Sequence, residues 1–260
     1  MREAGPADAP AILFLHGWSQ SSLSFDRQFS GPLAGRFRLV APDLRGHGAS
    51  DRPADPAATD SAVWAEDIAA VIAALDLGRP LAVGWSMGGW IIGDMLRHLG
   101  PVFGGIVTIG SVARIGAAAD PAMMARRKPD VRAAGMMDDD PAAQIAAAIA
   151  FARAMTAAPL SKRDLAWHVA LMMACPPAMR RAARLRDEDW RADFARHREA
   201  GLPALVLQGG AERVCFEPQA RETAEALGAD LRLIPGAGHM PFWEQTGTVD
   251  AAIAEIADQL

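Results

Sequence analysis

The sequence has little of several features that would define a function at once. Its two cysteines, Cys175 and Cys215, are far apart and form no CxxC pair, so a disulfide framework and metal ligation are both disfavoured. The formal net charge of −5 supplies no basic field for nucleic acid. No apolar run is long enough to cross a bilayer, and the polar residues 1–10 lack the apolar region of a signal peptide. These absences predict a cytoplasmic protein with no membrane span and no nucleic-acid partner.

The sequence does have the pattern of an α/β protein. Its 260 residues can bury one large core, with room for an inserted subdomain. Short apolar runs alternate with helical patterns, which favours βαβ units and a largely parallel sheet. The runs that we expect to be strands are 11–15, 38–41, 81–83, 104–109, 204–207 and 230–234. The clearest of the amphipathic helices is expected at 61–75.

The alternation stops after residue 110 and resumes near residue 202. Between them, Ala- and Met-rich stretches predict helices at 121–127, 141–155, 162–174 and 177–198. We therefore expect a core formed by 1–110 and 202–260, with a helical cap at 111–201 over the site. Methionines of the cap are expected either to line an apolar pocket or to fill the helix core. They are Met123, Met124, Met136, Met137, Met155, Met172, Met173 and Met179.

A serine stands where the third strand turns into a helix. Residues 84–88 read G-W-S-M-G, the G-x-S-x-G pattern that holds a serine on a strained strand-to-helix turn. The following helix directs free N–H groups and its positive dipole end at Ser86, so negative charge is stabilised there. The alternative is a packing turn with an incidental serine, since the pattern also arises by chance. The partners elsewhere in the chain decide between the two.

Other polar residues also follow predicted strands. Parallel sheets place their sites beyond the carboxyl ends of the strands. His16, Asp43, Ser86 and Ser111 all lie at such ends. A serine nucleophile requires a base, and a histidine base requires a carboxylate to fix its tautomer. His239 follows the last strand and Glu212 the strand before it, which gives the order serine, acid, histidine.

With these motifs together, the chain resembles the α/β-hydrolases over nearly its whole length. The signals that it shares with them are His16-Gly17-Trp18, the loop from Asp43 to Ser50, the elbow at Ser86, the acid loop at Glu212, and Gly238-His239. The resemblance implies that Ser86 is the nucleophile, His239 the general base and Glu212 the orienting acid. It also implies that the backbone N–H groups of Trp18 and Met87 form the oxyanion hole.

Two further expectations concern the acid and the substrate. The family usually has aspartate where this chain has Glu212, and Glu217 is the alternative acid. Trp18, Trp85 and His16 are expected to border the substrate, with His16 also shaping its loop. We expect an apolar acyl pocket that suits a medium chain. The resulting hypothesis is a serine carboxylic-ester hydrolase that works through an acyl-enzyme and needs no metal or organic cofactor.

A closer similarity is to the pimeloyl-acyl-carrier-protein methyl ester carboxylesterases of biotin synthesis, through 84–86, 16–18 and 128–131. It implies an acidic carrier protein as partner, although a solvated charged face explains the same residues. Candidates for the basic patch are Arg126, Arg127, Lys128, Arg132, Arg153, Lys162 and Arg163. Within the fold, C–C hydrolysis, lactone opening and perhydrolase or haloperoxidase-like activity are alternatives. A ligand receptor that turns over slowly is the alternative from another class.

Overall fold

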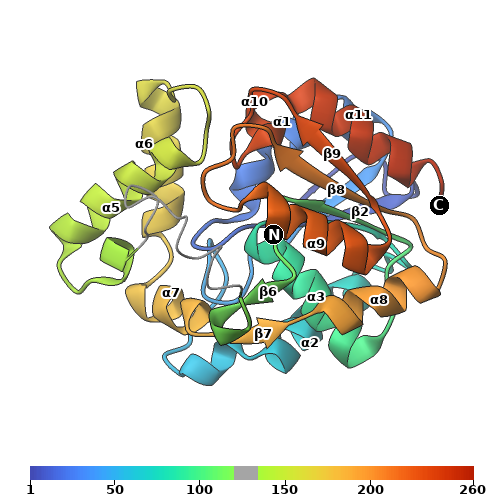
Figure 1. Ribbon diagram of the computed structural model, residues 1–260, viewed down its shortest axis with the longest axis horizontal. Coiled ribbons are helices and arrows are strands. Elements are labelled where there is room, and N and C mark those ends of the chain that lie inside the picture. The colour runs from blue at the N-terminus through green and yellow to red at the C-terminus, as the bar shows by residue number, and fades with distance from the viewer. Residues whose placement is uncertain (120–133) are drawn as a thin grey trace.

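The computed structural model describes residues 1–119 and 134–260, and its centre is a seven-stranded sheet (Figure 1). The strand order is β1-β3-β2-β4-β5-β8-β9, with β1 antiparallel to β3 and every other pair parallel. The strands are β1 (Arg2–Ala4), β2 (Ala11–Leu15), β3 (Arg38–Ala41), β4 (Leu81–Trp85), β5 (Gly105–Ile109), β8 (Ala204–Gly209) and β9 (Asp230–Ile234). The predicted α/β fold with a mostly parallel sheet is confirmed.

Helices cover both faces of this sheet. One face is covered by α1 (Asp26–Phe29) and α11 (Thr246–Ala257). The other is covered by α2 (Ser61–Ala74), α3 (Met87–Leu99), α8 (Arg191–Glu199) and α9 (Glu217–Leu227). Because both faces are covered, the central strands β4 and β5 are buried at every position, which explains their continuous apolar sequence.

The cap projects from one end of the sheet as a separate group of helices (Figure 1). Its described part includes a short 3₁₀ helix at Ala134–Met137, then α5 (Pro141–Ala154), α6 (Lys162–Met173) and α7 (Pro177–Arg184). The predicted helix at 121–127 lies outside the described residues. Within those residues, no helix is long and apolar enough to cross a membrane.

The predicted single helix at 177–198 is wrong. The chain leaves α7 at Arg184, forms β7 (Glu188–Asp189), and begins α8 at Arg191. β7 pairs with β6 (Arg114–Ile115), which the sequence pattern also missed because each is only a two-residue strand. Helix α8 then packs against α3 and α9, so it contacts the helices of the core although it lies within the range 111–201.

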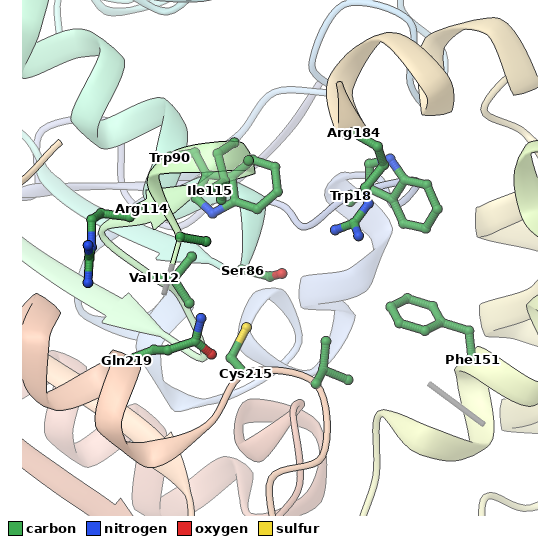
Figure 2. Close-up of a pocket in the computed structure, with 13 residues that line it drawn as sticks. Trp18, Ser86, Trp90, Val112, Arg114, Ile115, Phe151, Arg184, Cys215 and Gln219 are labelled. Atoms are coloured by element: carbon green, nitrogen blue, oxygen red, sulfur yellow. The ribbon is translucent and has the colours of Figure 1, made fainter. Parts of the chain in front are cut away.

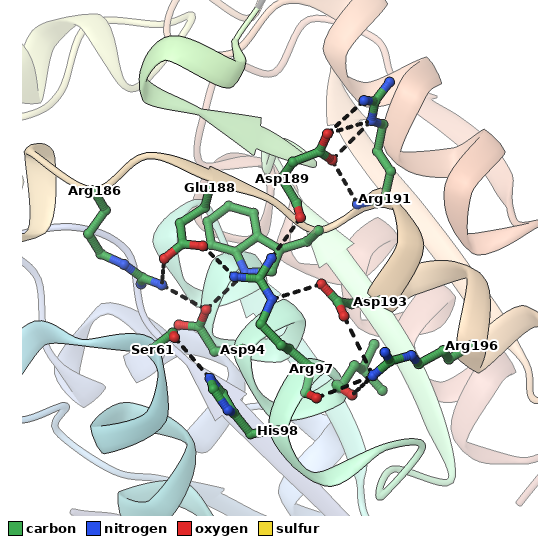
Figure 3. A network of polar contacts seen from close by, with 12 residues as sticks. Ser61, Asp94, Arg97, His98, Arg186, Glu188, Asp189, Arg191, Asp193 and Arg196 are labelled. Atoms are coloured by element: carbon green, nitrogen blue, oxygen red, sulfur yellow. Dashed lines mark hydrogen bonds and ion pairs between the residues drawn. The ribbon is translucent and has the colours of Figure 1, made fainter.

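A polar network joins this returning segment to α3, the helix that follows Ser86 (Figure 3). Asp94 of α3 is fully buried and accepts hydrogen bonds from Arg186 Nη2 at 2.7 Å and Trp190 Nε1 at 2.8 Å. Burial raises the pKa of Asp94 despite the guanidinium beside it. Arg97, one turn along, pairs with Glu188 and with Asp193. The network therefore anchors the end of the cap to the helix of the elbow.

Candidate functional site

Ser86 occupies a strained turn between β4 and α3. Its φ of 53° and ψ of −116° lie outside the regions that a residue with a side chain usually adopts. Neighbouring backbone holds it there, because Ser86 N–H donates to Ile109 O at 2.9 Å and Ser111 Oγ donates to Ser86 O at 2.8 Å. Such strain costs on the order of 1–3 kcal/mol and is concentrated at functional sites. The turn has the conformation that the G-x-S-x-G pattern predicts.

The two glycines of the pattern are required by close packing. A Cβ on Gly88 would lie 1.9 Å from Leu15 O, and one on Gly84 would lie 2.7 Å from the backbone of Gly88. No side chain fits at either position without moving the backbone. The glycines thus allow α3 to begin directly against β2 and β4, which leaves the Ser86 side chain at the carboxyl edge of the sheet.

His239 and Glu212 form a buried pair. The distance from His239 Nδ1 to Glu212 Oε2 is 2.8 Å, and the two side chains are 1% and 4% exposed. The other oxygen, Glu212 Oε1, accepts the N–H groups of Arg213 at 2.8 Å and Val214 at 2.6 Å. Glu217, the alternative acid, instead pairs with Arg221 on the surface of α9. Of the two candidates, the structure brings Glu212 to the histidine.

The loop that carries His239 is held beside Ser86. Trp85, which precedes the serine, donates from Nε1 to His239 O at 2.9 Å. A Cβ on Gly110 would lie 2.9 Å from His239 Nδ1, and the neighbouring Ile109 O accepts the Ser86 N–H. The imidazole and the serine therefore both lie against the end of β5. Gly110 has a φ of 54°, so both its conformation and the available space favour glycine.

Ser86 opens into a cavity of about 130 Å³ between the sheet and the cap (Figure 2). Its hydroxyl points into this space, and aromatic and aliphatic side chains form much of the wall. The lining residues are Trp18, Ser86, Trp90, Val112, Arg114, Ile115, Gly116, Ala119, Phe151, Arg184, Val214, Cys215 and Gln219. Sequence reasoning singled out only Trp18 and Ser86 from this set. The others come from six separate segments, so no local pattern groups them.

Trp85 and His16 do not line the cavity, which differs from the prediction that both border the substrate. Trp85 is 1% exposed, and its ring packs against His239 and Phe242 on the inner side of the elbow. His16 is fully buried, accepts the Leu44 N–H at Nε2 and contacts Gly17 O through Nδ1. The expected role of His16 in shaping its loop agrees with these contacts.

The loop after β2 carries Trp18 to the cavity. Ser19 N–H donates to His47 Nε2 at 3.3 Å, and Trp18 Nε1 donates to Arg180 O of α7 at 3.1 Å. Burial lowers the pKa of His16 to about 4 and that of His47 to about 3, so both rings are neutral acceptors near pH 7. Met87 is the first residue of α3, where N–H groups have no partner within the helix.

Of the two arrangements expected for the cap methionines, the described residues show packing in the helix core and not the lining of the cavity. Met136, Met155, Met172 and Met179 are buried within the cap and its contacts with the core, and none of them lines the cavity. Met123 and Met124 lie outside the described residues. The aromatic rings of Trp18 and Phe151 supply the apolar wall instead, edge to face with centroids 6.0 Å apart.

Comparison with known proteins identifies the family to which this fold and this site belong. Residues 12–252 match the alpha/beta hydrolase family, and the chain belongs to that family. It is 29% identical over 261 residues to the AB hydrolase superfamily protein YisY of Bacillus subtilis (strain 168), covering 95% of this chain and 91% of that protein.

Two further relatives are esterases by name. The crystal structure of esterase RhEst1 from Rhodococcus sp. ECU1013 superimposes with a TM-score of 0.86 at 30% identity, covering all of this chain and 94% of that one. The bifunctional esterase/perhydrolase DCH of Acinetobacter calcoaceticus is 43% identical over 88 residues, which are 34% of this chain and 31% of that protein. None of these three proteins is named as a pimeloyl-carrier esterase.

Proposed function

We propose that this protein is a serine carboxylic-ester hydrolase in which Ser86, His239 and Glu212 form the catalytic triad. The observation that carries the proposal is the buried His239–Glu212 pair held beside a strained serine that opens into a cavity. A hydroxyl becomes a competent nucleophile only when a positioned base removes its proton, and this arrangement supplies both the base and the acid that orients it.

The proposed reaction has two halves. Ser86 Oγ attacks the ester carbonyl while His239 Nε2 takes the hydroxyl proton, and the C–O bond to the alcohol then breaks as His239 returns that proton to it. Water, deprotonated by the same imidazole, then attacks the acyl-enzyme and releases the acid and Ser86. The backbone N–H groups of Trp18 and Met87 would hold the oxyanion in both halves. Glu212 Oε2 keeps the proton of the resting imidazole on Nδ1, which leaves Nε2 free to accept.

The cavity supports a short to medium acyl group or an aromatic ring. A dry cavity of about 150 Å³ holds one benzene molecule, so a space of about 130 Å³ suits roughly six non-hydrogen atoms. Trp18 and Phe151 offer apolar surface to such a group. We infer that acyl chains of about four to six carbons are preferred and that longer chains require the cap to move.

The experiment is a series of p-nitrophenyl esters from acetate to laurate, with Ser86→Ala beside the wild type. We expect multiple turnovers with a maximum near butanoate or hexanoate, and a loss of at least 10³-fold in Ser86→Ala. A single burst without turnover would favour the slow receptor. Wild-type turnover that persists in Ser86→Ala would overturn the proposal.

A carrier-bound substrate remains a finer hypothesis within the same reaction. Arg153, Lys162 and Arg213 border a surface hollow of about 440 Å³ beside the cap, and this hollow supports contact with an acidic carrier protein. Of the other predicted basic residues, Arg163 is exposed on α6, whereas Arg126, Arg127, Lys128 and Arg132 lie outside the described residues. Hydrolysis of a pimeloyl-carrier methyl ester at least tenfold faster than of free dimethyl pimelate would support this hypothesis, and equal rates would reject it.

Perhydrolysis is a second candidate activity, favoured by the similarity to the esterase/perhydrolase DCH. In that reaction hydrogen peroxide replaces water as the nucleophile that attacks the acyl-enzyme, and a peracid leaves. Measurement of peracid formed from acetate esters in peroxide, compared with acetate released, gives the partition between the two nucleophiles.

A further inference from the structure

One short segment of the cap contacts both loops that carry the His239–Glu212 pair. This segment, residues 155–158, follows α5 and is called the cap loop below. Met240 N–H, next to His239, donates to Met155 O at 3.0 Å. Arg213, next to Glu212, donates from Nη2 to Thr156 O at 2.6 Å. The two partners of the pair are thus tied to the same few residues of the cap.

Glu244 joins the histidine loop to the cap loop through its carboxylate. It lies on the short helix α10 (Pro241–Glu244), which begins two residues after His239. Its Oε1 accepts the N–H groups of Ala157 at 2.7 Å and Ala158 at 3.2 Å. Its Oε2 accepts the N–H of Gly238 at 2.6 Å. Each oxygen therefore bonds a different segment, one in the cap and one directly before the imidazole.

The two segments meet backbone to backbone at Gly238. A Cβ at this position would lie 2.8 Å from Ala157 N and 2.9 Å from the carbonyl carbon of Thr156. Gly238, His239 and Thr156 are buried and Ala157 is half-buried, so the contact begins in the interior and ends near the surface. This close approach gives a physical reason for glycine before the histidine.

We propose that Glu244 is a positioning residue that sets the place of the His239 imidazole by fixing the histidine loop to the cap loop. The inference rests on the proposed function, because it assigns His239 as the base for Ser86. Proton transfer at Ser86 then depends on the position of the cap. Glu244 does not line the cavity itself; the cap contributes other residues, such as Phe151, to the cavity wall.

The chemistry of the carboxylate makes this role testable by a nearly isosteric change. Three N–H donors converge on two acceptor oxygens, and glutamine has only one acceptor oxygen. In Glu244→Gln an NH₂ group must face either Gly238 N–H or the N–H groups of the cap loop. One segment then moves away, and a displacement of about 1 Å at a catalytic group can cost about 10²-fold in rate.

The test compares Glu244→Gln and Glu244→Asp with the control Glu255→Gln, which removes an exposed carboxylate of α11 that pairs with Arg232 of β9. Two readouts are used: steady-state hydrolysis of p-nitrophenyl butanoate, and the second-order rate at which a fluorophosphonate labels Ser86. We expect Glu244→Gln to lower kcat and the labelling rate 10- to 100-fold with KM within about twofold. Glu244→Asp is one methylene shorter but keeps two acceptor oxygens, so it is expected to lower both less, and the control to lower neither.

Active-site titration separates positioning from a general loss of folded protein. The proposal is overturned if Glu244→Gln lowers only the fraction of the protein that can be labelled and leaves the labelling rate per active molecule unchanged. It is equally overturned if only KM rises. If the wild type labels at Ser86 but hydrolyses no ester, the proposed function fails, and the labelling rates still decide the role of Glu244. If the wild type does not label, both proposals fail.

Discussion

Replacing Glu212 by glutamine is expected to lower kcat by about 10³- to 10⁴-fold without unfolding the protein. Glu212 accepts three donors, His239 Nδ1–H and the N–H groups of Arg213 and Val214, whereas glutamine has one acceptor oxygen. If that oxygen faces His239, two backbone N–H groups lose a charged acceptor, at about 1.5–3 kcal/mol each. If it faces the backbone, only the bond to His239 changes, so this orientation is favoured.

The favoured orientation places an NH₂ group opposite His239 Nδ1. The imidazole must then accept at Nδ1 and carry its proton on Nε2, where it can no longer take the proton of Ser86. In serine proteases this wrong tautomer costs about 10⁴-fold, which is about 5.5 kcal/mol of transition-state stabilisation.

The assay is p-nitrophenyl butanoate hydrolysis with thermal melting as the check on folding, and Glu217→Gln is the matched control. Glu217 is an exposed glutamate only five positions away and is bonded to Arg221, so its loss should leave kcat unchanged. A folded Glu212→Gln variant that keeps kcat within tenfold of the wild type would refute the assignment of the acid.

Two other predictions concern stability and chain-length preference. Burial raises the pKa of Asp250 to about 6, so the folded state binds its proton more tightly than the unfolded state, and stability falls as pH rises from about 4 to 6. Asp250→Asn should therefore gain up to about 3 kcal/mol in urea unfolding at pH 8 and roughly half of that at pH 5, and a gain independent of pH would contradict this cause. Phe151→Ala, which removes an aromatic wall of the cavity, should lower kcat/KM for butanoate about tenfold and shift the optimum to longer chains; an unchanged profile would place the acyl group elsewhere.

The sequence was most informative where local chemistry decides the conformation. The predicted strands at 11–15, 38–41 and 230–234 agree with the structure at both ends. The first two are mostly apolar and buried, as is typical of strands inside a parallel sheet. The third, at the edge of the sheet, is only partly buried and alternates leucine with charged residues. The elbow at Ser86 was predictable for a similar reason, since glycine two residues before and after a serine is needed only where backbones nearly touch.

The remaining features depend on contacts between distant residues. The chain between α7 and α8 contains no glycine or proline, so its break at β7 had no local signal. Contacts with distant residues, such as the bond from Arg186 to Asp94, hold the segment in place. Trp85 adjoins Ser86 in sequence, but successive side chains leave a strand on opposite faces, and the indole points away from the cavity. Glu244 has no signal in the sequence pattern, because its role depends on backbone N–H groups of Gly238 and of the cap loop.

The central claim is that an acyl group passes through Ser86, and mass spectrometry of the protein quenched in acid during turnover of p-nitrophenyl hexanoate tests it most directly. The account predicts a hexanoyl adduct on the peptide that contains Ser86, formed within the burst and lost as substrate is exhausted, and no adduct on that peptide in Ser86→Ala. Turnover with no adduct under any quench condition, or an adduct that forms on another residue at the rate of turnover, would contradict it.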